Sequence, residues 1–205
     1  MGDEIANILR HRVMVLDGSM GVMIQHLSLD EDSFRGKLFK DWSVRLKGNN
    51  DLLCLTEPDT IREIHRHYLE AGADIIETNT FNAQAISQEE YGMQEYVAEI
   101  NRAAAKLARE EANRMTALTP DKPRFVAGSI GPTGKTASMS QNMDDPASRS
   151  ISYDQLREAY NEQMTALVEA GIDLLLIETV FDTLNVKAAL RAAEDAFSQD
   201  RKSVV

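Results

Sequence analysis

The stretch EAGADIIET at residues 70–78 and the stretch EAGIDLLLIET at residues 169–179 carry the same order of features. Each begins with a Glu-Ala-Gly that suits the end of a helix, because glycine tolerates the left-handed backbone found there. An Asp comes next, and a short continuous apolar run follows it. Such runs are typical of strands buried on both faces of a parallel sheet. Each stretch closes on Glu-Thr, so both predict a carboxylate at the carboxyl end of a strand.

Further apolar runs and amphipathic segments continue this alternation along the chain. Five strands are predicted at residues 13–16, 52–55, 75–76, 125–127 and 174–177, and a sixth begins at Val204 and Val205. Helices are predicted at residues 22–27, 59–71, 95–115, 153–170 and 183–197. Capping boxes are predicted at Thr60 with Glu63 and at Ser152 with Gln155. Strands that alternate with helices of this length predict an α/β fold with a parallel sheet.

The composition is that of an ordinary globular chain with an acidic balance. The 205 residues include 22 Lys and Arg against 33 Asp and Glu, which gives a net charge of −11. This charge argues against nucleic acid or anionic lipid as a partner, since both need a basic face. No apolar run reaches the roughly 18 residues of a membrane-spanning helix, and the first residues lack the apolar core of a signal peptide. We therefore expect a cytoplasmic protein with neither nucleic acid nor membrane among its partners.

Polar residues gather directly after the predicted strands. The clusters lie at residues 17–19, 77–80, 129–133 and 178–179. Because the carboxyl ends of parallel strands meet at one edge of a sheet, these side chains are predicted to line one mouth, where α/β folds bind ligands. In the first cluster, a carboxylate stands beside glycine-rich backbone whose N–H groups suit an anion. That combination fits a zwitterion and points to an amino-acid substrate.

Five spaced blocks of sequence resemble the homocysteine S-methyltransferases, and most of all the N-terminal, homocysteine-binding module of cobalamin-dependent methionine synthases. The blocks are LDGSMG at 16–21, KGNND at 47–51, AGADIIETNTF at 71–81, AGSIGPT at 127–133 and IETVFDT at 177–183. The residues FRG at 34–36 and the long polar loop at 131–151 add to the likeness to the methionine synthases. The resemblance runs from about residue 8 to the end of the chain.

This resemblance implies a (β/α)₈ TIM barrel, with residues 1–205 as the first five βα units of one incomplete barrel domain that would continue past Val205. It implies homocysteine as substrate, a zinc ion that turns the substrate thiol into a thiolate, and methylcobalamin as the methyl donor. Cobalamin would be recharged from 5-methyltetrahydrofolate on other modules of the same polypeptide. Asp17, Gly18 and Glu178 match family positions that hold the amino-acid end of homocysteine. Asn79, Thr80 and Ser129 would line the same mouth.

The family's metal site has no match in this stretch of sequence. By the resemblance, zinc is held by three cysteines on later strands, which are expected beyond Val205, whereas this chain has one cysteine, Cys54, inside an apolar run. We therefore expect no catalytic residue, no metal ligand and no bound cofactor in these 205 residues, and no methyl transfer by them alone. An incomplete barrel also leaves strand edges and apolar surface uncovered, which favours self-association or contact with the rest of the same protein.

Three other functions stay open at this point. The first alternative is a homocysteine methyltransferase that uses another methyl donor. The second is a non-catalytic binding or assembly fragment. As a third alternative, Glu77 and Glu178 would form the carboxylate pair of a barrel glycoside hydrolase. Clefts that bind sugars are usually lined with aromatic residues, and the low aromatic content of 6% disfavours that alternative.

Overall fold

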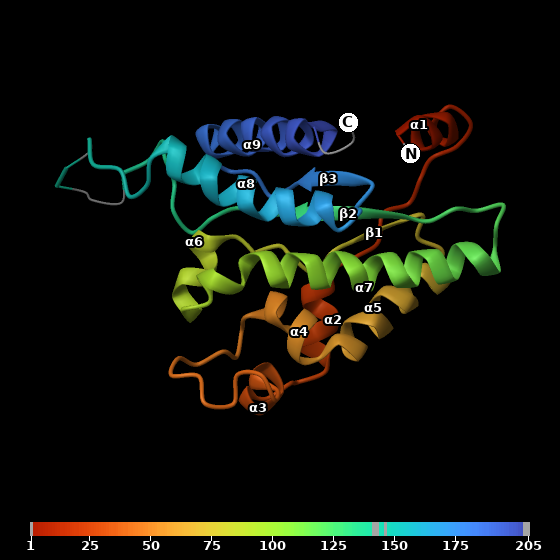
Figure 1. Cartoon of the computed structure of the whole chain (residues 1–205), viewed down its shortest axis with the longest axis horizontal. Coiled ribbons are helices and arrows are strands. Elements are labelled where there is room, and N and C mark those ends of the chain that lie inside the picture. Colours follow the sequence, from red (N-terminus) through yellow and green to blue (C-terminus); the bar gives the residue numbers. More distant parts are fainter. Residues whose placement is uncertain (1, 141–143, 146, 203–205) are drawn as a thin grey trace.

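The computed structural model describes residues 2–140, 144–145 and 147–202, and its helices alternate with the strands of one sheet (Figure 1). Within these residues, three parallel strands pair in sequence order: β1 (Ile75–Glu77), β2 (Phe125–Ile130) and β3 (Leu174–Ile177). The predicted parallel α/β fold is therefore confirmed. The sixth strand predicted at Val204 and Val205 lies outside the described residues, so it stays a prediction, as does the continuation of the barrel past Val205.

The segment around Leu16 takes a fourth position in the sheet. Leu16 forms a parallel bridge with Ile75, beside β1. The Asp17 N–H then donates to the Ile75 carbonyl at 2.9 Å. The order is thus this edge segment, β1, β2 and β3, each beside its neighbour in the chain. Strands follow one another in this way in a section of a (β/α)₈ barrel.

The prediction of five strands is wrong in the part of the chain that is described. Residues 13–16 contribute a bridge at Leu16 rather than a full strand. The predicted second strand is helical, because a 3₁₀ helix (Asn50–Leu52) runs directly into α4 (Leu53–Thr56). A buried apolar run of four residues has the same sequence pattern in a strand and in a buried helix. The described chain therefore holds four βα units rather than five.

A long helix follows each of the four strand positions. These helices are α5 (Pro58–Ala71), α7 (Val97–Leu118), α8 (Tyr153–Glu169) and α9 (Thr183–Lys202). Helix α7 packs on both α5 and α8, and α8 packs along α9 (Figure 1). Their buried faces supply most of the core, including Ile61 of α5, Ile100 of α7 and Leu156 of α8. Burial of each such side chain contributes about 1.5–3 kcal/mol.

The ends of these helices test the predicted capping signals. The box at Ser152 and Gln155 is confirmed, since each residue's side chain accepts the other's backbone N–H. Gly72 follows α5 with φ +112°, the left-handed stop expected from the sequence. The box predicted at Thr60 is wrong, because α5 begins earlier, at Pro58. Proline is favoured at the first helical position, where its missing N–H costs nothing.

The two stretches that share a sequence pattern also share a hydrogen-bond pattern at the amino ends of their strands. The Asp74 N–H donates to the Val15 carbonyl at 2.8 Å, and the Asp74 carboxylate accepts the Val15 N–H at 2.8 Å. Asp173 repeats this exchange with Val126, at 2.9 and 2.7 Å. The likeness of the two stretches is therefore structural, and each Asp fixes its strand beside the preceding strand position.

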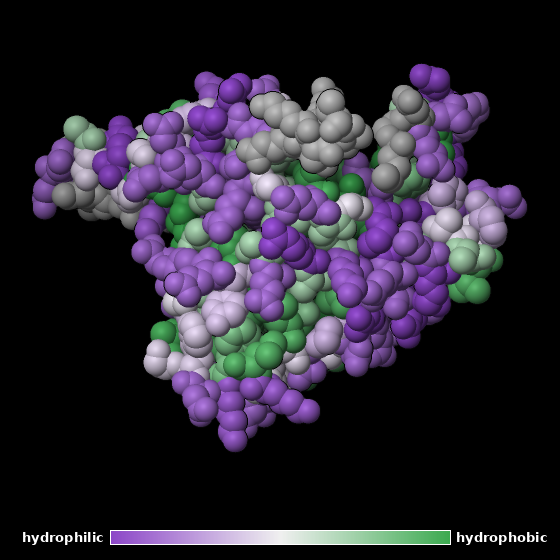
Figure 2. Space-filling model, viewed as in Figure 1, coloured by the Kyte–Doolittle hydropathy of each residue, from purple (hydrophilic) through white to green (hydrophobic). Residues whose placement is uncertain are grey.

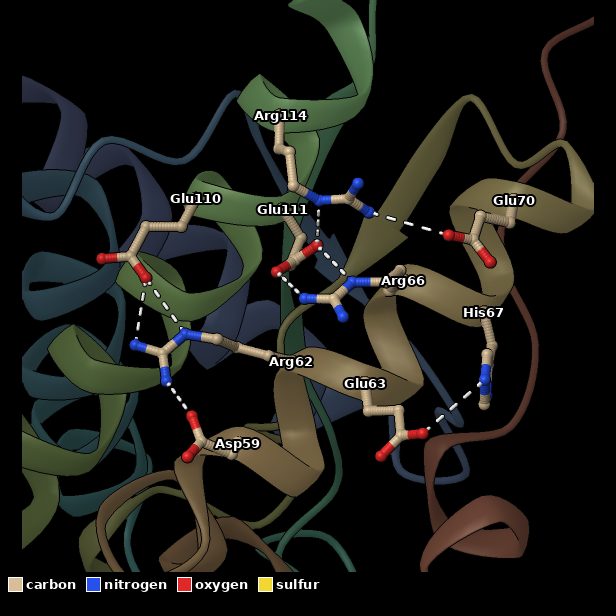
Figure 3. A network of polar contacts seen from close by, with 9 residues as sticks. All are labelled: Asp59, Arg62, Glu63, Arg66, His67, Glu70, Glu110, Glu111 and Arg114. Carbon is tan, nitrogen blue, oxygen red and sulfur yellow. Dashed lines mark hydrogen bonds and ion pairs between the residues drawn. The ribbon is translucent and has the colours of Figure 1, made fainter. Parts of the chain in front are cut away.

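A network of ion pairs joins α5 to α7 on the outside of the sheet (Figure 3). Its centre is Glu111, which is buried and pairs with Arg66 at 2.9 Å and with Arg114 at 2.8 Å. Burial alone would raise the pKa of Glu111, but the hydrogen bonds from the two arginines outweigh it and lower the pKa. Arg62 also pairs with the more exposed Glu110 at 3.1 Å.

Short elements complete the fold. They are α1 (Gly2–Leu9), α2 (Met20–His26), α3 (Glu31–Arg35), α6 (Ala85–Gln88) and two 3₁₀ helices, Glu89–Tyr91 and Gln94–Tyr96. Figure 2 shows hydrophilic residues over most of the visible face, with hydrophobic residues at the surface in the region of α2 and α4. None of the described helices is both long and apolar enough to cross a membrane.

Candidate functional site

A pocket of about 500 Å³ opens at the carboxyl ends of the strands. Its walls come from the segment after Leu16, the 3₁₀ helix that begins at Asn50, the loop after β1 and the ends of β2 and β3. All six residues singled out in the sequence line it: Asp17, Gly18, Asn79, Thr80, Ser129 and Glu178. The structure therefore brings the predicted residues together, and their role toward a substrate stays a prediction.

Asp17 lies where the edge segment leaves the sheet. Its Oδ2 atom accepts the Glu77 N–H at 3.0 Å, whereas its Oδ1 atom is buried without a partner in the described structure. Burial raises the pKa of Asp17 to about 7, and the charge of Glu178 adds to the rise. A buried acceptor without a hydrogen-bond donor destabilises the folded protein. A ligand that donates a hydrogen bond to this atom removes that penalty and therefore binds more tightly.

Gly18 lies against the ring of Tyr68, which comes from α5. A Cβ atom at position 18 would stand 2.9 Å from Tyr68 Cε1, closer than real side chains approach. The Tyr68 hydroxyl donates to the Ser19 carbonyl at 3.1 Å and so ties α5 to the turn beside the pocket. Ser19 in turn caps α2 by accepting the Val22 N–H at 3.3 Å. Glycine at position 18 lets this turn pass close to the tyrosine.

Glu178 is held from the β2 side of the pocket. The Ser129 hydroxyl donates to Glu178 Oε1 at 2.5 Å, and the Glu178 N–H donates to the Ile130 carbonyl at 3.0 Å. The next residue, Thr179, has φ +54°, a left-handed conformation that is rare for a β-branched residue. Strained backbone of this kind persists where the surrounding structure fixes it, often at functional sites. The Glu178 carboxylate is thus positioned by both strand and turn.

Thr80 and Asn79 hold the walls of the pocket to one another. The Thr80 hydroxyl donates to the Ser129 carbonyl at 2.8 Å, so it links the loop after β1 to β2. The Asn79 side chain donates to the Asn50 carbonyl at 2.7 Å, so it links the same loop to the 3₁₀ helix. Both side chains are buried. Their hydrogen bonds make them part of the framework around the pocket.

Glu77 lines the pocket as well, and the site predicted from the sequence did not include it. Burial raises the pKa of Glu77 to about 8, together with a hydrogen bond to Glu178 and the charges of Glu178 and Asp17. The signal for Glu77 was in the sequence, because it closes the first repeated stretch just as Glu178 closes the second. The sequence places the cluster at residues 77–80 at the mouth, but it assigns Glu77 a task only in the sugar-hydrolase alternative.

Asp51 is a second pocket residue that the sequence reasoning missed. It is almost fully buried, and its Oδ1 atom accepts the Asn82 N–H at 3.1 Å. Burial raises the pKa of Asp51 to about 7. The block KGNND contains this residue, but the predicted strand at 52–55 placed it before a strand instead of after one. The helical turn that replaces that strand is what brings Asp51 to the pocket.

The described residues do not fit a zinc site. The Cys54 thiol is buried and contacts the Asn79 carbonyl at 3.6 Å, and burial raises its pKa, which disfavours the thiolate that zinc needs. Among the described residues, no group of three His, Cys, Asp or Glu side chains is placed to hold a metal ion. The zinc cysteines expected beyond Val205 stay a prediction. What the described residues bring together at the pocket is four carboxyl groups, those of Asp17, Asp51, Glu77 and Glu178.

Comparison with known protein families gives a direct match. Residues 14–205 match the family model for homocysteine S-methyltransferase, and this match covers most of the chain. The chain belongs to the homocysteine S-methyltransferase family. This result disfavours the sugar hydrolase considered from the sequence.

Solved structures of the homocysteine methyltransferase MmuM from Escherichia coli share the fold. The metallated form matches with a TM-score of 0.70 and 23% sequence identity, over 94% of this chain and 62% of that chain. The apo form matches with a TM-score of 0.63 and 21% identity, over 91% and 57%. The likeness confirms the partial barrel fold, and the chain spans about three fifths of the length of these proteins.

Proposed function

We propose that the chain is the homocysteine-binding part of a methionine synthase, which transfers a methyl group from methylcobalamin to zinc-activated homocysteine and yields methionine. The observation that carries this proposal is the pocket at the strand ends. Asp17, Gly18 and Glu178, predicted to hold the amino-acid end of homocysteine, line it together with the other three residues predicted for the same mouth. Membership of the homocysteine S-methyltransferase family supports homocysteine as the substrate.

In this proposal Asp17 and Glu178 bind the ammonium group of homocysteine. The acidic character of the pocket supports that role, because its described lining contains four carboxyl groups and no Lys, Arg or His. A cleft with charges of one sign attracts a ligand group of the opposite sign. The unpartnered Oδ1 atom of Asp17 supplies an acceptor for one of the ammonium hydrogens.

Zinc and cobalamin belong, in this proposal, to the longer protein. Bound zinc supplies the chemistry of turning a thiol into a thiolate at neutral pH. The described residues take a different part, which is to bind and orient the amino acid. Cobalamin and folate modules of the same polypeptide would deliver the methyl group.

A homocysteine methyltransferase with another methyl donor is the second candidate. It is favoured by one observation, since the matching solved structures are those of the homocysteine methyltransferase MmuM. The pocket residues would have the same task in both cases. Methyl transfer from methylcobalamin by the protein that carries the whole barrel separates the two candidates, because only the first predicts it.

The test compares the 205-residue chain with the protein that carries the whole barrel. We expect the longer protein to bind one equivalent of zinc and to transfer the methyl group, and the 205-residue chain to do neither. In the longer protein, Glu178→Ala should weaken homocysteine binding and leave the zinc content near normal. Glu169→Ala, on the exposed face of α8, is the control. One equivalent of zinc in the short chain, or unchanged homocysteine affinity in Glu178→Ala, would contradict the proposal.

A further inference from the structure

Glu77 is a carboxylate of the pocket to which the proposed function gives no task. It is the last residue of β1, and its backbone N–H donates to Asp17 Oδ2 at 3.0 Å. Its side chain is hydrogen-bonded to Glu178, which follows β3. β1 and β3 are alternate strands, with β2 between them. Glu77 at the carboxyl end of β1 and Glu178 directly after β3 line the same pocket, so the sheet brings these two carboxyl groups to one edge.

The groups that face this pair are acidic or neutral. Asp17 comes from the edge segment and Asp51 from the 3₁₀ helix at Asn50. The Tyr68 hydroxyl of α5 donates to the Ser19 carbonyl, and burial together with the charge of Asp17 raises its pKa. Lys, Arg and His are absent from the described lining of the pocket. Two carboxyl groups in hydrogen-bond contact without a neighbouring cation do not both stay ionised, and they retain a proton between them.

We propose that Glu77 and Glu178 share one proton while no substrate is bound, and that the ammonium group of the amino-acid substrate displaces it. Binding then releases this proton to the solvent. One carboxyl O–H bond breaks, and the proton goes to bulk water. The ammonium group keeps its three N–H bonds and donates hydrogen bonds to the two carboxylates that result. The inference rests on the proposed function for the identity of the ligand.

The titration of the pocket supports this step. Burial, together with the contact to Glu178, raises the pKa of Glu77 to about 8, so Glu77 is mostly protonated at neutral pH. A bound ammonium group lowers the pKa of Glu77, because a nearby cation favours the ionised carboxylate. Binding should therefore become tighter as the pH rises from about 6 toward the pKa of Glu77.

The first test needs no ligand. Carbon-13 NMR of protein labelled at the glutamate carboxyl carbons follows the titration of Glu77, whose signal is assigned by its loss in Glu77→Gln. We expect a midpoint near 8 in the wild type and a clearly lower midpoint in Glu178→Gln, which removes the partner. An ordinary midpoint in the wild type, or the same midpoint in both proteins, would overturn the shared proton.

The second test measures proton release in an unbuffered salt solution at pH 7, with base added to hold the pH as ligand is titrated. The ligands are L-homocysteine and L-methionine, and the second has no thiol proton to release. The wild type should release about one proton more per bound ligand than Glu77→Gln. Glu169→Gln, exposed on α8, should behave as the wild type.

The outcomes separate the inference from the proposed function. If both amino acids bind but the wild type and Glu77→Gln release the same number of protons, the displaced proton is wrong and the proposed function stands. If neither amino acid binds at millimolar concentration to the chain or to the protein with the whole barrel, the proposed function fails, and the displacement fails with it. The carboxyl titration still decides in that case whether the two glutamates share a proton.

Discussion

Gly131 passes so close to the loop after β1 that no other residue fits without rearrangement. Its N–H donates to the Phe81 carbonyl at 3.1 Å, and Phe81 lines the pocket. A Cβ atom at position 131 would meet that same backbone oxygen closer than any real side chain does, at 2.4 Å. The neighbour is backbone rather than the end of a flexible side chain, so it cannot easily move aside. The close contact fixes the loop that carries Asn79 and Thr80.

We expect Gly131→Ala to destabilise the fold by about 1–3 kcal/mol, the usual cost of forcing extra volume into a packed site. Gly134→Ala, a few residues along, is the matched control, because a Cβ atom there meets nothing within 4 Å. Urea unfolding measures both. Equal stability of Gly131→Ala and the wild type would show that the loop is less constrained than the contact indicates.

Glu77 should also make stability depend on pH. Its folded-state pKa of about 8 lies above the unfolded value near 4.5, so the folded chain holds a proton that the unfolded chain releases. Its contribution to stability is fully present below the unfolded value and is lost as the pH rises toward 8. Glu77→Gln should therefore raise the melting temperature, with a gain that grows from pH 5 to pH 8. A gain that is constant over this range would contradict the raised pKa.

At the scale of single elements, the signals that carry a local mechanism predict the structure best. Ser152 and Gln155 begin α8 as expected, and Gly72 ends α5 as expected. The failure is the run at 52–55, where apolar character alone does not distinguish a strand from a buried helix. That error also hid Asp51, because the position of a pocket residue depends on the element beside it. Glu178 was placed correctly after its strand because β2 and β3 pair as predicted. Asp17 was also placed correctly at a strand end, although its segment lies beside β1 and not beside the strand predicted at 52–55.

The ion pairs between α5 and α7 allow a matched test of burial. Glu111→Gln leaves two arginines beside a neutral group at a buried position and should cost about 1–3 kcal/mol. Glu110→Gln on the same helix removes a more exposed partner of Arg62 and should cost at most about 1 kcal/mol. Urea unfolding of both variants measures the difference. A Glu110→Gln cost equal to that of Glu111→Gln would mean that burial does not decide the strength of these pairs.

At the scale of the whole molecule, the sheet ends at two strand positions that pair on one side only in the described structure. Val13 is 83% exposed beside the first edge, and Phe181 is 59% exposed after the last strand. Unpaired strand edges and exposed apolar residues favour association with another chain or with the remainder of a barrel. The sequence predicted these edges because it predicted a partial barrel. It overestimated the number of strands between them.

We therefore predict that the 205-residue chain sediments as an assembly larger than its 22.9 kDa monomer. Val15→Lys places a charge at the first edge and should shift the chain toward monomer, whereas Leu38→Lys, exposed in the segment after α3, should not. The protein with the whole barrel should show no such dependence on Val15. A compact 205-residue monomer that unfolds cooperatively would contradict this prediction.

The central claim is that the carboxylates at the strand ends bind the ammonium group of homocysteine. The most direct measurement is a titration of nitrogen-15-labelled protein, followed by NMR, with L-homocysteine and with 4-sulfanylbutanoate, which is homocysteine without its amino group. We expect L-homocysteine to shift the amide signals of Asp17, Gly18, Glu77 and Glu178, and the deaminated analogue to leave them nearly unchanged at the same concentration. Equal shifts with both ligands, or shifts confined to residues outside the pocket, would contradict the account.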